Sequence, residues 1–161
     1  MDKIYDIILF GATGFTGQIT AKYLSEHAGK ENLSWAIAGR GQEKLNHLTE
    51  SLHANKPGII TADVNDYQSL CKMTSQGKIL MNAAGPFSRY GKNVVKACIE
   101  SSTHYLDITG EPSFIADIYN NYFEQAVDKK SFVVNCCGFD SIPADYAACL
   151  TAKKLPHKEP K

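Results

Sequence analysis

The sequence predicts an α/β fold: a doubly wound parallel sheet with helices on both faces. Six apolar runs of strand length alternate with segments of helical period along the chain, which is typical of a parallel sheet covered by helices. The chain has 161 residues, of which 43% are hydrophobic and 21% charged, so it has the size and composition of one folded domain. We expect the strand order 3-2-1-4-5-6.

In the first part of the chain, strands and helices follow each other at short intervals. Apolar runs predict strands at Tyr5–Phe10, Ser34–Ala38 and Gly58–Ala62. The helix expected at Phe15–His27 has an apolar face made of Phe15, Ile19, Tyr23 and Leu24. The inner face of a second helix is indicated by Leu45, Leu48 and Leu52.

The later part of the chain continues the alternation. We predict strands at Ile79–Ala83, His104–Asp107 and Phe132–Cys136. Between them, helices are expected at Lys92–Ser101, with Val94, Val95 and Cys98 facing inward, and at Phe114–Lys130, burying Ile115, Ile118, Tyr122 and Ala126. A last helix begins near Pro143, because proline is favoured in a first helical turn. The periodicity is lost from Lys153 onward.

A glycine-rich turn, Gly11-Ala12-Thr13-Gly14-Phe15-Thr16-Gly17, is the strongest signal for a ligand. It follows a buried strand and opens an amphipathic helix, which is the context required of a dinucleotide-binding motif in a Rossmann-type fold. Gly11 allows a sharp turn, Gly14 leaves room for a pyrophosphate, and Gly17 lets the helix pack close to the sheet. Backbone N–H groups of the helix N-terminus would face the phosphates, and Thr13 and Thr16 would add hydroxyl donors. The alternative is a glycine-rich turn without a ligand.

The end of the second strand indicates which dinucleotide binds. NAD-preferring sites carry an acid there to bind the ribose 2′-hydroxyl, but this strand ends Ala38-Gly39-Arg40. The guanidinium of Arg40 suits a 2′-phosphate, and Lys44 would add positive charge, so we predict NADP, with NAD as a second choice. The alternative for Arg40 is a solvated loop arginine.

Two further segments are candidates for the same site. Asp63 follows the third strand, where it would either meet the adenine ring or cap the helix that begins near Asp66. The fourth strand is left through small residues, which allow the backbone to approach the ribose and nicotinamide closely. A tight loop with only a steric need for small residues is the alternative. The candidate binding residues in the segment after the fourth strand are Ala83, Ala84, Gly85 and Pro86.

With these residues in hand, the chain resembles the amino-terminal half of the saccharopine dehydrogenase-like oxidoreductases. The resemblance rests on the glycine turn 11–17, on 38–40 and on the stretches Asn82–Phe87, Tyr105–Glu111 and Gly138–Asp145. It implies an NAD(P)-dependent oxidoreductase with a Rossmann domain and a second, substrate-binding domain. We therefore expect residues 1–150 to be the NAD(P)-binding domain and 151–161 a tail, with the substrate domain absent from a truncated chain.

The candidate catalytic residues lie in the loop after the fifth strand. None of the eight tyrosines has a lysine four residues later, so the Tyr-x-x-x-Lys mechanism of short-chain dehydrogenases is absent. Asp107 or Glu111 would accept a proton as hydride leaves a neighbouring C–H bond. Alternatively, Glu111 caps the helix at Phe114. We predict hydride transfer to or from an amino-acid-like or lipid-like substrate; the alternative function is a non-catalytic NADP-binding sensor or regulator.

The overall composition narrows the range of partners. Lys plus Arg and Asp plus Glu each number 17, which gives no sign of nucleic-acid binding. The five histidines and five cysteines show no metal-ligand spacing, so we predict no metal site. A redox role for Cys136 and Cys137 is an alternative to their reading as core thiols. We expect a cytoplasmic protein, and exposed sheet edges would allow a homodimer.

Overall fold

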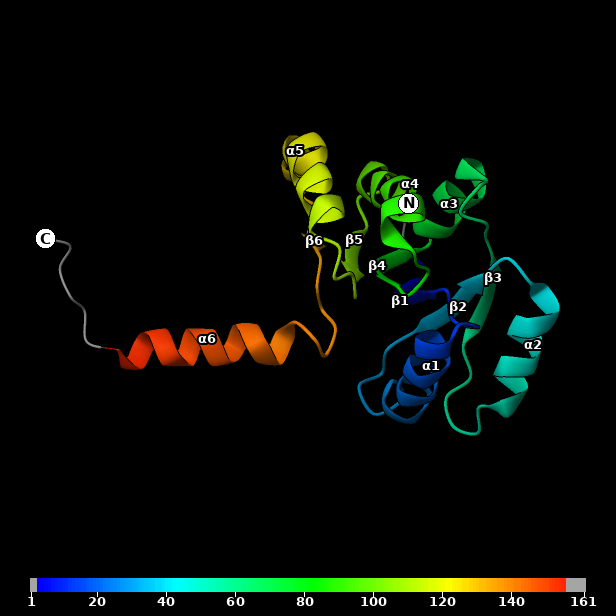
Figure 1. Ribbon diagram of the computed structural model, residues 1–161. Helices are drawn as coiled ribbons and strands as arrows, with labels where there is room; N and C mark the ends of the chain where they lie inside the picture. The colour runs from blue at the N-terminus through cyan, green and yellow to red at the C-terminus, as the bar shows by residue number, and fades with distance from the viewer. Residues whose placement is uncertain (1–2, 156–161) are drawn as a thin grey trace, which may run out of the picture.

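A computed structural model describes residues 3–155 of the chain as a six-stranded sheet with helices on both faces (Figure 1). The strand order is β3-β2-β1-β4-β5-β6, and all neighbouring strands are parallel. The predicted fold class and strand order are therefore confirmed. The strands are β1 Tyr5–Phe10, β2 Trp35–Gly39, β3 Gly58–Thr61, β4 Gly77–Asn82, β5 His104–Asp107 and β6 Val133–Val134.

Helices cover the two faces of the sheet unequally (Figure 1). One face carries α1 and α2, the other carries α3, α4 and α5, and α6 projects away from the sheet (Figure 1). The helices are α1 Phe15–His27, α2 Gln42–Ser51, α3 Tyr67–Thr74, α4 Phe87–Glu100, α5 Pro112–Asp128 and α6 Ile142–Lys154. Among residues 3–155, no helix combines the length and apolar composition needed to cross a membrane.

Alternation along the central strand β1 divides the core in two. Ile8 and Phe10 pack with side chains of α3, α4 and α5, whereas Leu9, between them, packs with side chains of α1 and α2. Successive side chains of a strand point to opposite faces, so a continuous apolar run supplies both halves of the core. This is why β1 has a near-continuous apolar sequence and not an alternating one.

The apolar face predicted for α1 is wrong. Phe15, Ile19 and Tyr23 are exposed, and of the four predicted residues only Leu24 is buried. The buried face consists instead of Gly17, Ala21, Leu24 and Ser25. The first turns of α1 lie so close to the strand-to-helix turn that only small side chains fit between them.

Several predicted boundaries shift. The fourth helix begins at Phe87, five residues before the predicted Lys92, because the chain enters α4 directly after Pro86. The sixth strand is reduced from Phe132–Cys136 to Val133–Val134, since Asn135 and Cys136 bond to Asp107 and leave the sheet. The inward residues Val94, Val95 and Cys98 of α4 are buried, as predicted.

The last helix extends beyond the predicted end of the domain. Residue 150, at which the sequence suggested a boundary, lies inside α6, which runs continuously to Lys154. No residue of α6 is buried, so the packed body of the protein ends before Ile142. Residues 156–161 of the predicted tail lie outside the described residues.

Candidate cofactor-binding site

A crevice of about 340 Å³ lies at the carboxyl ends of β1, β2, β3 and β4. This is the position at which doubly wound sheets bind ligands, next to the point where the strand order reverses. It brings together residues from four loops that are separated in the sequence. Eight predicted site residues line it: Gly11, Thr13, Gly14, Arg40, Asp63, Ala83, Ala84 and Gly85.

The three glycines of the turn meet different steric demands. Gly11 has φ +80°, and a Cβ there would lie 2.7 Å from the backbone nitrogen of Ala84, so both conformation and space require glycine. A Cβ at Gly17 would collide with the backbone of Gly11 and Ala12. A Cβ at Gly14 would meet only the carbonyl oxygen of Gly11, at 3.3 Å. Gly11 and Gly17 are therefore needed by the fold, whereas Gly14 leaves open space on the crevice side.

The N-terminus of α1 is built to receive an anion. Its N-cap residue is Gly14, which has no side chain to cap the helix, and the first turn carries no acidic residue. The first N–H groups of a helix lack partners within the helix and carry a partial positive charge. These groups are free to bind a phosphate.

Four of the predicted site residues lie outside the crevice. The side chain of Phe15 is 85% exposed, and Gly17 is buried against the turn. Pro86 is the N-cap residue of α4. Thr16 lines a separate small groove of about 80 Å³, between α1 and the ends of β4 and β5, which also contains Asp107.

Arg40 and Asp63 line the crevice from the loops after the neighbouring strands β2 and β3. Arg40 is exposed, and within residues 3–155 it takes part in none of the ion pairs, so its guanidinium is available to a ligand. Asp63 accepts hydrogen bonds from the backbone and side-chain nitrogens of Asn65. The helix cap considered for Asp63 is provided by Asp66, whose carboxylate accepts the N–H groups of Gln68 and Ser69.

Sequence reasoning missed six residues that line the crevice: Phe10, Gly39, Ala62, Val64, Asn65 and Tyr90. Tyr90 was missed because the fourth helix was expected to begin at Lys92, after this residue. Val64 and Asn65 directly follow Asp63 in the loop after β3. Once Asp63 is placed at the crevice, its neighbours could have been inferred from their position.

Asp107 is at the centre of a buried hydrogen-bond network. Its Oδ2 accepts the hydroxyl of Tyr105 at 2.8 Å and the side-chain amide of Asn135 at 2.7 Å. Its Oδ1 accepts the backbone N–H groups of Thr109 and Cys136. Asp107 is only 2% exposed. All four donors come from the chain itself, so the carboxylate joins the loop after β5 to the end of β6.

The network continues from Tyr105 to the loop after β4. Asn82 donates its side-chain amide to the Tyr105 hydroxyl at 3.1 Å and accepts the N–H of Ala84 at 2.9 Å. Burial, followed by the charge of Asp107, raises the pKa of Tyr105 well above its usual value, so this hydroxyl stays protonated and donates to Asp107. The crevice loop at Ala84 is thus held by the same network as Asp107.

Of the two adjacent cysteines, Cys137 does not have the surroundings of a reactive thiol. Burial, followed by the negative charge of Asp107, raises the pKa of the Cys137 thiol. A raised pKa lowers the fraction of thiolate, which is the reactive form. Within the described chain all five cysteines are free thiols.

Glu111 binds a helix other than the one expected. It is the N-cap residue of α5 but makes no side-chain bond to that helix. Its two carboxylate oxygens instead accept the N–H groups of Phe87 and Ser88, at 2.9 and 3.0 Å, at the start of α4. The predicted cap at Phe114 is therefore wrong. Hydrogen bonds from Ser88 and Phe87 lower the pKa of Glu111.

The Glu111 contact predicts a pH-dependent contribution to stability. Because the folded protein lowers the pKa of Glu111, the ionised group stabilises the fold above its unfolded pKa, and this is lost as the pH falls through the folded value. Glu111→Gln should lower the melting temperature at pH 7, and the difference from wild type should shrink below about pH 4. Thermal denaturation, monitored by circular dichroism at several pH values, measures this difference in melting temperature. Glu124→Gln, an exposed change within α5, should show no such pH dependence; an equal effect would contradict the role of Glu111.

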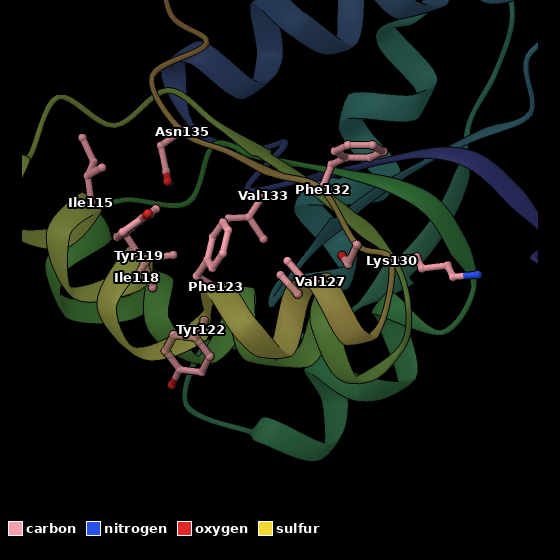
Figure 2. Close-up of a pocket in the computed structure, with 12 residues that line it drawn as sticks. Ile115, Ile118, Tyr119, Tyr122, Phe123, Val127, Lys130, Phe132, Val133 and Asn135 are labelled. Atoms are coloured by element: carbon pink, nitrogen blue, oxygen red, sulfur yellow. The ribbon is translucent and has the colours of Figure 1, made fainter.

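A second, more apolar groove of about 440 Å³ lies between α5 and the chain around β6. Figure 2 shows Phe123 and Val127 pointing from α5 toward the segment that carries Val133. None of the predicted cofactor residues lines this groove. It is therefore separate from the crevice at the strand ends.

Known proteins share this sequence and this arrangement. Residues 7–134 match the saccharopine dehydrogenase NADP binding domain family. The chain is 39% identical to a saccharopine dehydrogenase-like oxidoreductase of Bos taurus, over 94% of this chain and 38% of that protein. It is also 39% identical to a lipid droplet localized protein of Caenorhabditis elegans, over 88% of this chain and 34% of that protein. The chain thus spans little more than a third of these relatives.

A solved structure supports the same fold. Saccharopine dehydrogenase (L-Glu forming) of Saccharomyces cerevisiae superposes on this chain with a TM-score of 0.75 and 19% identity, covering 92% of this chain and 31% of that one. At this identity the likeness concerns the fold alone. Together with the match over residues 7–134, the glycine turn and the crevice lead to one conclusion: the chain belongs to the saccharopine dehydrogenase NADP-binding domain family.

Proposed function

We propose that this chain is the cofactor-binding part of an NADP-dependent oxidoreductase, with NADP lying in the crevice between Arg40 and Gly85. The proposal rests on two features: the N-terminus of α1 at Gly14 has no side-chain cap, and the guanidinium of Arg40 at the crevice forms no ion pair within residues 3–155. The first suits the pyrophosphate and the second suits the 2′-phosphate. When bound, the nicotinamide would supply the hydride chemistry.

From β3 to β4, the crevice residues are proposed to contact successive parts of the cofactor, from the adenine to the ribose on the nicotinamide side. Val64 and Asn65 stand beside Asp63 after β3, where an adenine would lie next to the 2′-phosphate site at Arg40. The backbone of Ala84, held by Asn82, would approach the ribose on the nicotinamide side. Small residues at this point allow the approach without a steric barrier.

The test is to measure, by isothermal titration calorimetry, the equilibrium binding of NADPH and NADH to the wild-type protein and to Arg40→Ala. NADPH should bind more tightly than NADH, and Arg40→Ala should weaken NADPH binding by about 10- to 100-fold, because a charged hydrogen-bond partner of the phosphate is lost. NADH binding should change little. Lys30→Ala, which removes an exposed cation after α1, is the matched control. Equal losses for both cofactors would contradict the role of Arg40.

The substrate is proposed to be an amino-acid-like or lipid-like molecule that exchanges hydride with the nicotinamide. The printed names of the relatives, a saccharopine dehydrogenase-like oxidoreductase and a lipid droplet localized protein, support one class each. Measuring NADPH oxidation with saccharopine-type amino acids and with enoyl lipids tests them. A cytoplasmic location and a homodimer formed through the sheet edges belong to the same proposal.

Catalytic roles for Asp107 and Glu111 remain predictions. Each carboxylate is engaged by donors of the chain itself, and this arrangement favours a structural role for both. The same observation favours the second candidate function, an NADP-binding sensor or regulator. In that case NADPH would bind as expected, but neither substrate class would oxidise it.

A further inference from the structure

Helix α6 lies away from the body of the protein, although its composition is that of a buried helix. Between Ile142 and Ala152 the only charged residue is Asp145, and every residue from 142 to 154 is exposed. Helices that are apolar on all sides are normally buried, and a 13-residue helix is only marginally stable alone in water. α6 therefore needs a surface against which to pack.

The sheet offers one half-face that no helix covers. On the side of α1 and α2, no helix lies over β5 and β6 (Figure 1), and Met81 of β4 packs at the edge of the core cluster formed by α1 and α2. One row of side chains crosses these three strands there, from Met81 through Leu106 to Val134. Met81 and Leu106 are half-buried, and Val134 is 43% exposed. Parallel sheets are normally covered on both faces, so Leu106 and Val134 lack the helix that would normally cover them.

The start of α6 is fixed next to this row. The N–H of Cys137 donates to the carbonyl oxygen of Asp107 at 2.7 Å, and a Cβ on Gly138 would lie 3.3 Å from the Cβ of Ile108. The chain is thus held at the end of β5 as far as Gly138. Only residues 139–141 separate it from α6, and the ring of Phe139 is 89% exposed. These three residues form the short turn between the sheet and α6, in which the N–H groups of Ser141 and Ile142 donate to the carbonyl oxygen of Gly138 at 3.1 Å.

The helix is about as long as β4, the longest strand of this half-face, whereas β5 has four residues and β6 has two. Thirteen residues of helix span about 20 Å, and the six-residue strand β4 spans about the same length. A helix that ran back from Gly138, antiparallel to the strands, would lie beside α1, which also starts at the carboxyl end of the sheet. Ile142, Tyr146 and Leu150 recur every four residues and so share one face of α6.

We propose that the uncovered half-face of β4, β5 and β6 is the docking site of α6 from the same chain. In the docked position α6 runs along the strands, and its stripe of Ile142, Tyr146 and Leu150 crosses the row of Met81, Leu106 and Val134, which runs across them. Residues 139–141 act as the hinge between this position and the extended one. A second copy is a less favourable source of the helix, because a short tether gives α6 an effective concentration on the order of millimolar.

Docking of α6 would also cover the small groove that contains Thr16 and Asp107. The small groove with Thr16 and Asp107 lies between α1 and the same strands, so α6 covers it when docked. Covering this groove would exclude water from the end of the site proposed for the nicotinamide. This consequence rests on the proposed function, whereas the docking itself does not.

Two measurements on the whole chain, without NADPH, test the docking. Hydrogen exchange reports the amides of α6, and peptide-resolved alkylation reports Cys149, which lies on the stripe side of the helix one turn after Tyr146. Both should be slowed at least about tenfold relative to an unstructured peptide if docked molecules outnumber free ones by about ten to one. Val134→Lys places a charge under the docked helix and should remove this protection. Val127→Lys, at a 56% exposed position of α5, is the matched control and should leave it unchanged.

Each outcome decides the proposal. Unprotected α6 amides in the wild type would overturn it, as would equal protection in wild type and Val134→Lys. Protection that falls on dilution would assign α6 to a second copy and overturn docking within one chain. Exchange of the β1 amides checks that Val134→Lys still folds; if they lost protection too, Val134→Thr, a polar change without charge, would replace it. Because no cofactor is present, a failure to bind NADPH would not affect the result.

Discussion

Gly17→Ala is expected to destabilise the protein by about 3 kcal/mol, which would lower the melting temperature by roughly 10 °C in a domain of this size. The added Cβ would collide with backbone atoms of Gly11 and Ala12, and backbone cannot move aside as a flexible side chain can. Relief would require α1 to shift away from the sheet, which would open the core around Leu9 and Ala21. Urea denaturation followed by circular dichroism measures the loss.

Gly14→Ala is the matched control for this prediction. Its Cβ would meet only the carbonyl oxygen of Gly11, at 3.3 Å, so the free energy of unfolding should change little. Because Gly14 lines the crevice, we expect this Cβ to take up space proposed for the pyrophosphate, so NADPH affinity should fall by at least about tenfold. If Gly14→Ala were as unstable as Gly17→Ala, the separation of folding and binding roles within the turn would be wrong.

Asp107→Ala is the second substitution with a large expected effect. It would leave the Tyr105 hydroxyl, the Asn135 amide and the N–H groups of Thr109 and Cys136 without their acceptor. Unsatisfied buried polar groups each cost about 1–3 kcal/mol, and relaxation recovers part of this. A total loss of about 4 kcal/mol is expected, measured by chemical denaturation.

A control at Asp63 separates this effect from the general removal of a carboxylate. Within residues 3–155, the carboxylate of Asp63 accepts hydrogen bonds only from Asn65, so Asp63→Ala, which keeps the backbone bonds, should cost little stability. Asp107→Asn keeps the shape and one acceptor oxygen, and we expect an intermediate loss. An Asp107→Ala protein with wild-type stability would show that the network carries little energy, and a catalytic role for Asp107 would then be favoured.

The order of strands and most residues that line the crevice could be predicted from local patterns. Apolar runs between helical segments predicted the sheet order, and the glycine turn with Arg40 predicted the crevice. These features are local, because a turn that needs φ above zero or a strand buried on both faces demands particular residues at the position itself. Eight predicted residues accordingly line one cavity.

The partners of polar side chains could not be predicted in this way. Glu111 binds the start of α4, 23 and 24 residues earlier in the chain, although its sequence position pointed to α5. The distance along the chain carries no information about which helix end lies nearest in space. The same holds for Asn135, which reaches Asp107 across 28 residues.

What the sequence by itself determined about this protein is therefore its fold class and the glycine turn and arginine that line the crevice. Only the tertiary structure decided which faces of the helices are buried and which carboxylates are engaged. Phe15, Ile19 and Tyr23 form an apolar stripe, yet α1 turns Gly17 and Ala21 toward the sheet. The physical reason is the close approach of helix and sheet at the glycine turn, where space between backbones outweighs the hydrophobicity of any single side chain.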